Sequence, residues 1–265
     1  MVEIVFLGSG GGRFVLVSQL RSCAGFRIVG SKTVHVDPGP CYLSQCAKLK
    51  LKPSDVDVLL LSHGHVDHAN DANLVIEAMT GSGKKRRGAV FGGKGALLGS
   101  DEFDRSITRY HEKLVEKYVA LEEGGEAEFE GVKATATKTA HREAEGVGFI
   151  ISIDGKRIGY SGDTEYFEGM GNGLEACDAV VLNALQPRGS AISGHFGTEA
   201  AVKLLKGIRR KPALAVIQHF GMGMLKAGPE VEAAFIQGET GVRTVAARDG
   251  MVLKLEDATL EKFIG

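Results

Sequence analysis

The sequence predicts a mixed α/β (α+β) fold, with strands and helices in both halves of the chain. Short runs rich in β-branched residues dominate the first third. One run, VDVLLLS at 56–62, is apolar throughout, which is typical of a central strand buried on both faces. Helix–strand alternation follows in the last third. The chain has 265 residues and no linker or low-complexity stretch, so we expect a single domain over 1–265.

The elements are predicted in order from hydrophobic periodicity and from breaker residues. In the first half, strands are expected at 2–7, 14–18, 25–29, 33–37 and 56–62, with helices at 41–50 and 70–79. In the second half, strands are expected at 126–137, 147–153, 157–161, 178–182, 213–218, 242–247 and 251–255, with helices at 198–209 and about 229–238. The segment 101–121 gives no clear pattern, and the basic loop 81–88 is expected to be solvated.

The composition argues against several classes of protein. A net charge of −1 is unlike that of a general nucleic-acid binder or a polybasic membrane anchor. No apolar run approaches the roughly 20 residues of a membrane span, and the N-terminus has no signal-peptide pattern, so a cytoplasmic protein is expected. The cysteines form no C-x-x-C pair, which argues against thiolate zinc sites. All four are expected to be free and reduced: Cys23, Cys41, Cys46 and Cys177.

A glycine-rich loop follows the first predicted strand, in the stretch FLGSGGGR at 6–13. Consecutive glycines after a strand mark a turn that a ligand or another segment of the chain approaches closely. A P-loop would need Gly-Lys-Ser/Thr, which is absent. A dinucleotide fingerprint would need glycine where Arg13 stands. The two nucleotide-binding motifs are therefore excluded, and the partner of the loop stays open at this point.

Four candidate metal ligands lie within six residues at the end of the strand 56–62, in SHGHVDH at 62–68. Packing these groups together without a metal would bring several partly cationic side chains into contact. Alternate residues of an extended segment point to opposite sides, so His63 and His65 reach one ion only if the loop curls. Gly64 allows that curl. The pattern therefore predicts a metal site at this strand end.

The pattern His63-x-His65-x-Asp67-His68 resembles the signature of the metallo-β-lactamase superfamily. The resemblance extends to a third histidine, a Gly-Asp pair and a last histidine at a strand end, which here are His141, Asp163 in YSGDT, and His219. Asp37 in HVDPG resembles the family's first motif, in which an aspartate supports the site without binding the metal. Because the resemblance covers nearly the whole chain, it implies a four-layer αβ/βα sandwich of two facing sheets with helices outside.

The resemblance also implies a ligand set and a reaction. His63, His65 and His141 would hold one divalent ion, and Asp67, His68 and His219 a second, with Asp163 bridging. Zinc is expected, and manganese or iron would be tolerated. Two ions about 4 Å apart stabilise a bridging hydroxide, which Asp67 would orient for hydrolysis. The oxygen-reducing di-iron members carry glutamate where this chain has His65, so redox chemistry is not expected.

Two further stretches resemble the ribonuclease Z and phosphodiesterase branch of that superfamily. The first is FLGSGGGR with the later VDPGP, where backbone N–H groups of Gly10, Gly11 and Gly12, together with Arg13, would receive a phosphate. The second is GHFGTEAA at 194–201. By this resemblance His195 contacts the scissile phosphate and protonates the leaving oxygen, whereas the alternative is a surface histidine that caps a helix. His35 and His111 are expected to be structural or exposed.

Two departures argue against ribonuclease Z itself. Asn183 stands where that family carries the glutamate that pairs with its catalytic histidine. The interval from His141 to Asp163 is only 163 − 141 = 22 positions, which leaves no room for a tRNA-gripping arm. The KKRR loop at 84–87 is the one basic feature. Binding of tRNA is therefore not expected.

The sequence thus predicts a dinuclear metal-dependent phosphodiesterase that acts on a small-molecule or short, single-stranded nucleotide phosphoester. The main alternative is a carboxyl-ester, thioester or lactone hydrolase of the same fold, similar to glyoxalase II. A tRNA 3′-processing endonuclease and a non-catalytic metal-binding scaffold are weaker alternatives. The sequence leaves open the physiological substrate, the native metal, the oligomeric state (a homodimer included) and the role of 81–125.

Overall fold

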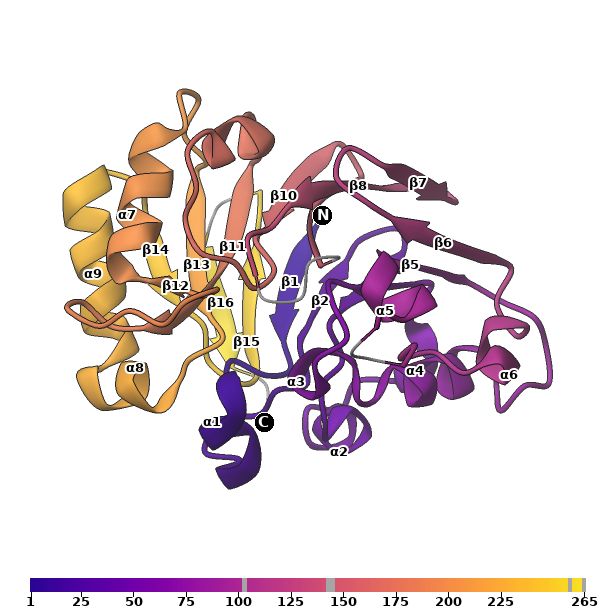
Figure 1. The fold of residues 1–265 in the computed structure, drawn as a ribbon. Helices are drawn as coiled ribbons and strands as arrows, with labels where there is room; N and C mark the ends of the chain where they lie inside the picture. Colours follow the sequence, from indigo (N-terminus) through magenta and orange to yellow (C-terminus); the bar gives the residue numbers. More distant parts are fainter. Residues whose placement is uncertain (102–103, 142–145, 257–258, 264–265) are drawn as a thin grey trace.

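Two β-sheets face each other in the structure, and helices cover the outer face of each (Figure 1). The computed structural model describes residues 1–101, 104–141, 146–256 and, for the backbone alone, 259–263. Buried side chains of both sheets, among them Phe6, Phe26, Phe149 and Tyr160, form the core between them. This arrangement confirms the predicted αβ/βα sandwich.

The first sheet has the order β16-β15-β1-β2-β3-β4-β5-β6. Its pairs are antiparallel from β16 to β3 and parallel from β3 to β6. The strands are β1 (Glu3–Phe6), β2 (Phe26–Val29), β3 (Thr33–Val36), β4 (Val58–Leu61), β5 (Ala89–Gly93), β6 (Lys117–Leu121), β15 (Met251–Lys254) and β16 (Thr259–Phe263). Its outer face packs against α2 (Tyr42–Lys48), α4 (Ala72–Met79) and α5 (Lys94–Leu98).

The second sheet has the order β14-β13-β11-β10-β9-β8-β7, with β12 paired to β11. It is parallel from β14 to β10 and antiparallel from β10 to β7. The strands are β7 (Glu126–Phe129), β8 (Val132–Lys138), β9 (Val147–Ile153), β10 (Lys156–Tyr160), β11 (Ala179–Gln186), β12 (Phe196–Gly197), β13 (Leu214–Gln218) and β14 (Thr244–Ala246). Its outer face packs against η2 (Met170–Leu174), α7 (Thr198–Gly207), α8 (Met222–Ala227) and α9 (Pro229–Thr240).

The strand β4 shows why the run 56–62 has no polar alternation. Val58 and Leu60 face the core between the sheets, whereas Leu59 and Leu61 face the helices. Because helices cover the parallel part of the sheet, both faces of this strand are buried. The prediction of a central, fully buried strand is confirmed.

The predicted strand at 14–18 is wrong, because these residues form the helix α1 (Gly12–Ser18). A short apolar run fits a strand and a helix equally well by periodicity. Only Val15 is buried in this helix, and Gln19 ends it in the left-handed conformation. Among the described residues, no helix has the length and hydrophobicity needed to span a membrane.

Other differences concern boundaries and short elements. The expected strand 126–137 is a hairpin of β7 and β8, because Glu130 and Gly131 turn the chain with positive φ. The expected helix 70–79 is preceded by a separate short helix, α3 (Val66–Ala69). The sequence did not predict β5, β6, β12, β16, α5, α8, α6 (Arg109–Glu112) or the 3-10 helix η1 (Pro53–Asp55). These elements are too short for periodicity to identify them.

Candidate metal centre

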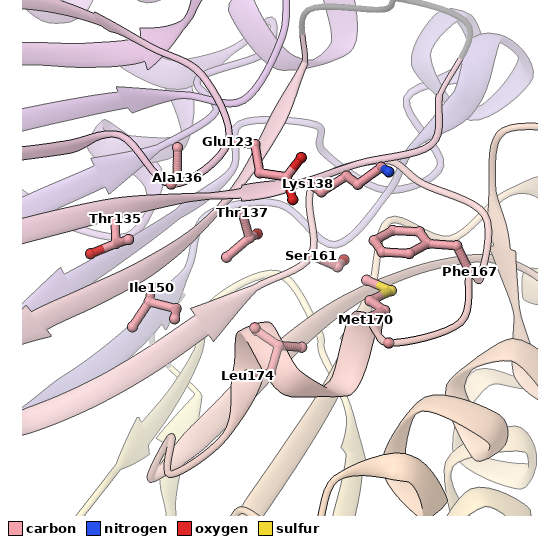
Figure 2. Close-up of a pocket in the computed structure, with 13 residues that line it drawn as sticks. Glu123, Thr135, Ala136, Thr137, Lys138, Ile150, Ser161, Phe167, Met170 and Leu174 are labelled. Atoms are coloured by element: carbon pink, nitrogen blue, oxygen red, sulfur yellow. The ribbon is translucent and has the colours of Figure 1, made fainter.

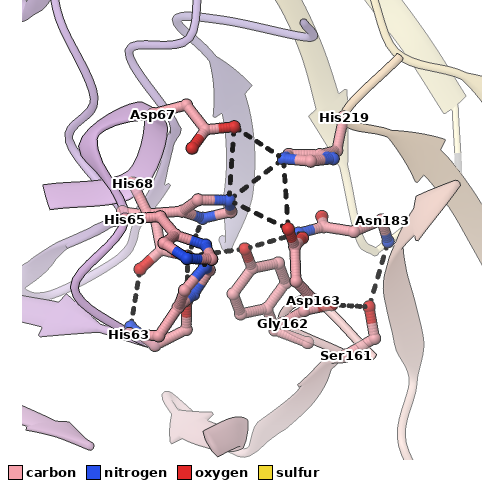
Figure 3. A network of polar contacts seen from close by, with 12 residues as sticks. His63, His65, Asp67, His68, Ser161, Gly162, Asp163, Asn183 and His219 are labelled. Atoms are coloured by element: carbon pink, nitrogen blue, oxygen red, sulfur yellow. Dashed lines mark hydrogen bonds and ion pairs between the residues drawn. The ribbon is translucent and has the colours of Figure 1, made fainter. Parts of the chain in front are cut away.

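The predicted ligands come together at one edge of the sandwich, where several strands end (Figure 3). His63 and His65 follow β4, and Asp163 and His219 follow β10 and β13. Because β10, β11 and β13 are parallel, their carboxyl ends lie at the same edge. This is the edge at which sheets of this kind bind ligands.

Three histidines form the first candidate metal group. His63 Nε2 lies 3.0 Å from His65 Nδ1, and His141 Nε2 lies 3.3 Å from the same atom. The other ring nitrogens of two of them are held by neighbours. Ser62 Oγ is 2.9 Å from His63 Nδ1, and His141 Nδ1 is 2.8 Å from the carbonyl oxygen of Gly194. The nitrogens that converge are therefore fixed in direction, as metal-binding imidazoles require.

Asp67, His68 and His219 form the second candidate metal group. The Nε2 atoms of the two histidines are 3.0 Å apart, and Asp67 Oδ2 lies 3.3 Å from that of His219. Asp163 lies beside this group, with its Oδ2 atom 3.4 Å from His68 Nε2 and 3.5 Å from His219 Nε2. Asp163 also shares a candidate group with His63 and another with His141. Its position between the two sets is the one predicted for a bridging ligand.

Asp37 supports the second candidate metal group through the ring nitrogen of His68 that faces away from the centre. Its carboxylate accepts hydrogen bonds from the backbone N–H and the hydroxyl of Ser62 and from the hydroxyl of Tyr160. Its Oδ2 atom is also 2.9 Å from His68 Nδ1. Since this contact turns His68 Nε2 toward the centre, Asp37 has the supporting position that the resemblance implied.

Asn183 has a role that the sequence did not reveal. Its side-chain amide donates to Asp163 Oδ1 at 2.7 Å, which leaves Oδ2 directed at the histidines. The same amide donates to the hydroxyl of Tyr160, and its oxygen accepts from Gln218. By the family resemblance, Asn183 stands where a glutamate would pair with His195. In the structure Asn183 instead donates to Asp163.

His195 reaches the centre from the loop before α7. Its Nδ1 atom lies 3.4 Å from Asp163 Oδ2, and its ring centroid is 4.8 Å from that of His141. This position argues against the alternative of a surface histidine that caps a helix. Because His195, His141 and Asp163 also form a candidate metal group, its position suits either a ligand or a substrate contact.

Glu165 joins three of the segments that carry site residues, and no sequence signal marked it. Its carboxylate accepts the backbone N–H of Gly194 at 3.1 Å, and its own N–H donates to the carbonyl of Ala140. Gly194 adopts a φ of +80°, which favours glycine. The peptide carbonyl of Gly194 in turn contacts His141. One exposed carboxylate thus links the neighbours of His141, Asp163 and His195.

At most of the shifted groups of the centre, the electrostatics favour the protonation states that bind a cation. Burial, and next the charge of His68, lower the pKa of His63, whereas burial and the neighbouring His141 lower that of His65. Burial opposes ionisation of Asp163, but His219 and His68 outweigh it and hold the pKa of this carboxyl well below its usual range. Neutral imidazoles and ionised carboxylates are the donor set that zinc and similar divalent ions require. His68 is the exception, because Asp163 and Asp67 outweigh its burial and raise its pKa, so it would release a proton when an ion binds. With that proton released, the residues present fit such ions.

The predicted phosphate-binding role of the glycine loop stays a prediction, and the hydrogen bonds of the loop do not favour it. The N–H groups of Gly10 and Gly11 donate to the carbonyls of Ser22 and Phe220, and that of Gly12 donates to Asp67 Oδ2 at 2.9 Å. These donors are already used within the chain. Arg13 is exposed at the start of α1 and, within the described residues, its side chain has no hydrogen bond or ion pair.

The basic loop is also less solvated than the sequence suggested. Arg87 donates to Asp57 and to three backbone carbonyls, and Arg86 Nε donates to the carbonyl of Val115. These two arginines hold the loop against the fold, although Arg86 remains exposed together with Lys84 and Lys85. The other histidines match their prediction, because His35 is fully buried and His111 pairs with Glu77.

A separate cavity of about 270 Å³ lies on the outer face of β8 and β9 (Figure 2). It is lined by Thr137, Lys138, Phe167, Met170 and Leu174, among others. None of the predicted ligands lines it. The candidate centre is therefore identified by its converging donor atoms and not by this cavity.

The comparisons with known proteins agree with this geometry. Residues 32–220 match the model of the beta-lactamase superfamily domain. The chain belongs to this superfamily. It is 32% identical over 255 residues to an uncharacterized protein of Methanocaldococcus jannaschii. This match covers 96% of this chain and 95% of that protein. It is 28% identical to a metal-dependent hydrolase of Thermoplasma acidophilum over 77% of this chain and 84% of that protein.

Solved structures of other proteins are similar to this chain in fold. The metallo-β-lactamase fold protein YhfI of Bacillus subtilis has a TM-score of 0.75 at 16% identity, covering 95% of this superfamily member and 98% of YhfI. A diphosphatase of the PhnP family has a TM-score of 0.68 at 18% identity, covering 98% of this chain and all of that one. At such low identity these structures establish the metallo-β-lactamase fold alone.

Proposed function

We propose that this centre hydrolyses phosphodiesters with the help of two divalent metal ions. The broader activity, metal-dependent hydrolysis, is supported by the superfamily and by relatives that carry that name. The observation that carries the phosphodiester assignment is the place of His195, whose Nδ1 atom is 3.4 Å from Asp163 Oδ2. The fold shared with a diphosphatase is compatible with phosphorus chemistry.

Seven residues would hold the two ions. His63, His65 and His141 would bind one, and Asp67, His68 and His219 the other, with Asp163 in contact with both. Zinc suits these ligands, and manganese or iron is also compatible with imidazoles and carboxylates. Bound ions of this kind supply Lewis-acid stabilisation of negative charge and lower the pKa of water. Because these seven residues complete both sets, His195 is assigned to the substrate.

Asp67 is positioned to orient the attacking water as well as to bind an ion. Burial opposes its ionisation, but the charge of His68 and the hydrogen bond from His219 hold its pKa below the usual range. The carboxylate is therefore ionised at neutral pH and can accept a hydrogen bond from water, which orients it. The N–H of Gly12 fixes its Oδ2 atom at 2.9 Å.

His195 is assigned to the phosphate and the leaving group. Burial lowers the pKa of this imidazole to about 4, so it is neutral at pH 7 in the free protein. A neutral imidazole donates one N–H hydrogen bond to a phosphate oxygen. The negative charge of a bound phosphodiester raises the pKa of the ring, so the imidazole can take up a proton from water and then give it to the leaving oxygen as the ester bond breaks.

The assignment is tested with bis(p-nitrophenyl) phosphate and protein reconstituted with zinc or manganese. We expect turnover that a chelator abolishes, and that His195→Ala lowers about 100-fold or more in kcat. His111→Ala is the matched control, because this histidine pairs with Glu77 and lies outside the candidate metal groups. If protein with two ions per chain cleaves p-nitrophenyl acetate but no diester, the proposal is wrong and carboxyl-ester hydrolysis replaces it.

A further inference from the structure

Large apolar side chains are exposed on four separate segments that lead to the candidate centre. The exposed fractions are 80% for Phe14, 58% for Val66, 46% for Ile192 and 37% for Tyr166. Single exposed apolar side chains are ordinary on a soluble protein. Several of them around one site mark a surface that a ligand covers.

Phe14 and Val66 form the first flank of the centre. Val66 lies between His65 and Asp67, and Phe14 lies in the first turn of α1. The hydrogen bond from the Gly12 N–H to Asp67 Oδ2 fixes this turn to the residue that follows Val66. Figure 1 shows α1 beside α3 and projecting from the sandwich. The first flank is therefore an apolar surface attached to a candidate metal ligand.

Ile192 and Tyr166 form the second flank. The carbonyl of Ile192 accepts the N–H of His195 at 3.2 Å, so this side chain is placed by the turn that carries the histidine. Tyr166 follows Glu165, whose carboxylate holds the N–H of Gly194. The segments after Asp163 and before His195, which carry these two exposed side chains, are thus joined beside the centre.

Both flanks reach the same imidazole, that of His219. Asp67, from the first flank, is 3.3 Å from His219 Nε2, and Asp163, from the second, is 3.5 Å from the same atom. A phosphodiester has one organic group on each side of its phosphorus atom. A substrate whose phosphate lies at the centre would place one group on each flank.

We propose that the preferred substrate is a phosphodiester with apolar aryl or alkyl groups, bound by Phe14 and Val66 on one flank and by Ile192 and Tyr166 on the other. This inference rests on the proposed phosphodiesterase activity. Phe14 and Tyr166 could also stack on nucleobases. However, the aliphatic Val66 and Ile192 offer no hydrogen bond to a ribose or to a base edge, so an apolar group fits all four side chains better.

Two substrates with the same leaving group separate the alternatives: p-nitrophenyl phenyl phosphate and thymidine 5′-(p-nitrophenyl phosphate). With the metal-loaded protein we expect kcat/KM to be about tenfold higher for the phenyl ester. Phe14→Ser and Ile192→Ser should each lower kcat/KM for the phenyl ester by about five- to tenfold, mainly through KM, which corresponds to the loss of one apolar contact surface. The effect on the thymidine ester should stay below about twofold.

Leu98→Ser and Val231→Ser are matched controls, because Leu98 is 60% and Val231 57% exposed and neither residue adjoins the centre in the sequence. Both controls should leave the ratio of the two kcat/KM values unchanged. Circular dichroism and metal content confirm that each variant is folded and loaded before kinetics. The use of one variant on each flank keeps the test decisive if either fails to fold.

The outcomes distinguish this inference from the proposed function. If neither diester is cleaved, the phosphodiesterase proposal itself is wrong. If the thymidine ester is preferred, or if Phe14→Ser and Ile192→Ser leave the ratio unchanged, the apolar substrate class is wrong and the phosphodiesterase proposal stands. Loss of a concentration-dependent dimer in Phe14→Ser, measured by sedimentation, with an unchanged ratio would identify α1 as a subunit contact and overturn the inference.

Discussion

Gly11 lies against the ring of His219 so closely that any side chain there would displace a candidate metal ligand. A Cβ atom built on Gly11 would lie 2.2 Å from Cδ2 and 2.4 Å from Nδ1 of that ring. Its own N–H donates to the carbonyl of Phe220, so the backbone cannot move away freely. The glycine loop that drew attention in the sequence therefore has a packing role at the centre.

Gly11→Ala should weaken the binding of the ion that His219 holds by about 10- to 100-fold, because the imidazole must shift. Metal affinity is measured by competition with a chromophoric chelator, and activity with bis(p-nitrophenyl) phosphate should fall in parallel. Gly238→Ala is the control, since Gly238 lies in α9 with nothing within 4 Å of its built Cβ. Wild-type affinity in Gly11→Ala would show that the ring position is unimportant.

At the level of single residues, the sequence predicted the candidate metal ligands better than the residues that orient them. The seven expected ligands converge because each lies at or soon after a strand end, and strand ends can be located from hydrophobic runs. Their binding of metal stays a prediction. The partners Asn183 and Glu165 could not be assigned, because which hydrogen bond a polar side chain makes depends on segments brought together only by the tertiary fold.

The loop that carries His195 shows how an element is fixed by several contacts. Thr198 and Arg188, on either side of the loop, both donate to the buried carboxylate of Glu232. Glu165 holds Gly194 in the middle. His195 is therefore presented by a loop tied at three points, which limits the loss of entropy when substrate binds.

Glu165→Ala should release the Gly194 peptide and lower kcat on a diester by about tenfold, with a smaller change in KM. Glu165→Gln should restore most of the activity, because its amide oxygen can still accept the Gly194 N–H. Glu168→Ala is the matched control on the same segment, since Glu168 is exposed and has no hydrogen bond or ion pair within the described residues. Equal activity in all three variants would remove Glu165 from the site.

The helix α1 marks the limit of element prediction from this sequence. The stretch FVLV at 14–17 has β-branched residues that favour a strand, yet Phe14 and Val17 are both exposed and only Val15 packs inward. No sheet edge is available there, since β1 already pairs with β2 and β15. The strands with long buried runs were predicted correctly because the core determines them, whereas α1 is determined by its attachment to Asp67.

At the scale of the whole molecule, burial of neutral histidines makes the metal-free protein sensitive to acid. Burial, ahead of neighbouring charges, lowers the pKa of His35, His63, His65 and His195. The unfolded chain binds these protons near pH 6.5 and the folded chain does not, so the free energy of unfolding falls as the pH drops below 6.5. His68 acts in the opposite sense, because Asp163 and Asp67 outweigh its burial and raise its pKa.

Four histidines have a lowered pKa and one has a raised pKa, so the free energy of unfolding should fall between pH 7 and pH 5. Each net proton contributes up to about 1.4 kcal/mol per pH unit. The carboxylates Asp67 and Asp163 add to the loss only below about pH 4, because their folded pKa values are lowered. Urea unfolding in excess chelator at pH 7, 6 and 5 measures the effect. A free energy of unfolding that is constant over this range would contradict the assigned neutral states.

The two candidate ions would join the two halves of the sandwich, because His63, His65, Asp67 and His68 come from the first sheet, and His141, Asp163 and His219 from the second. Ions that bind only the folded chain stabilise it by about 2.7 kcal/mol at 100 times Kd. For a chain of this size we expect metal loading to raise Tm by about 5 to 10 °C in calorimetry. His141→Ala should lose much of that increment, because it removes a ligand from the second sheet, whereas His111→Ala should retain it. A Tm that is the same with zinc and with chelator, in protein shown to contain two ions, would mean that the ions do not link the sheets.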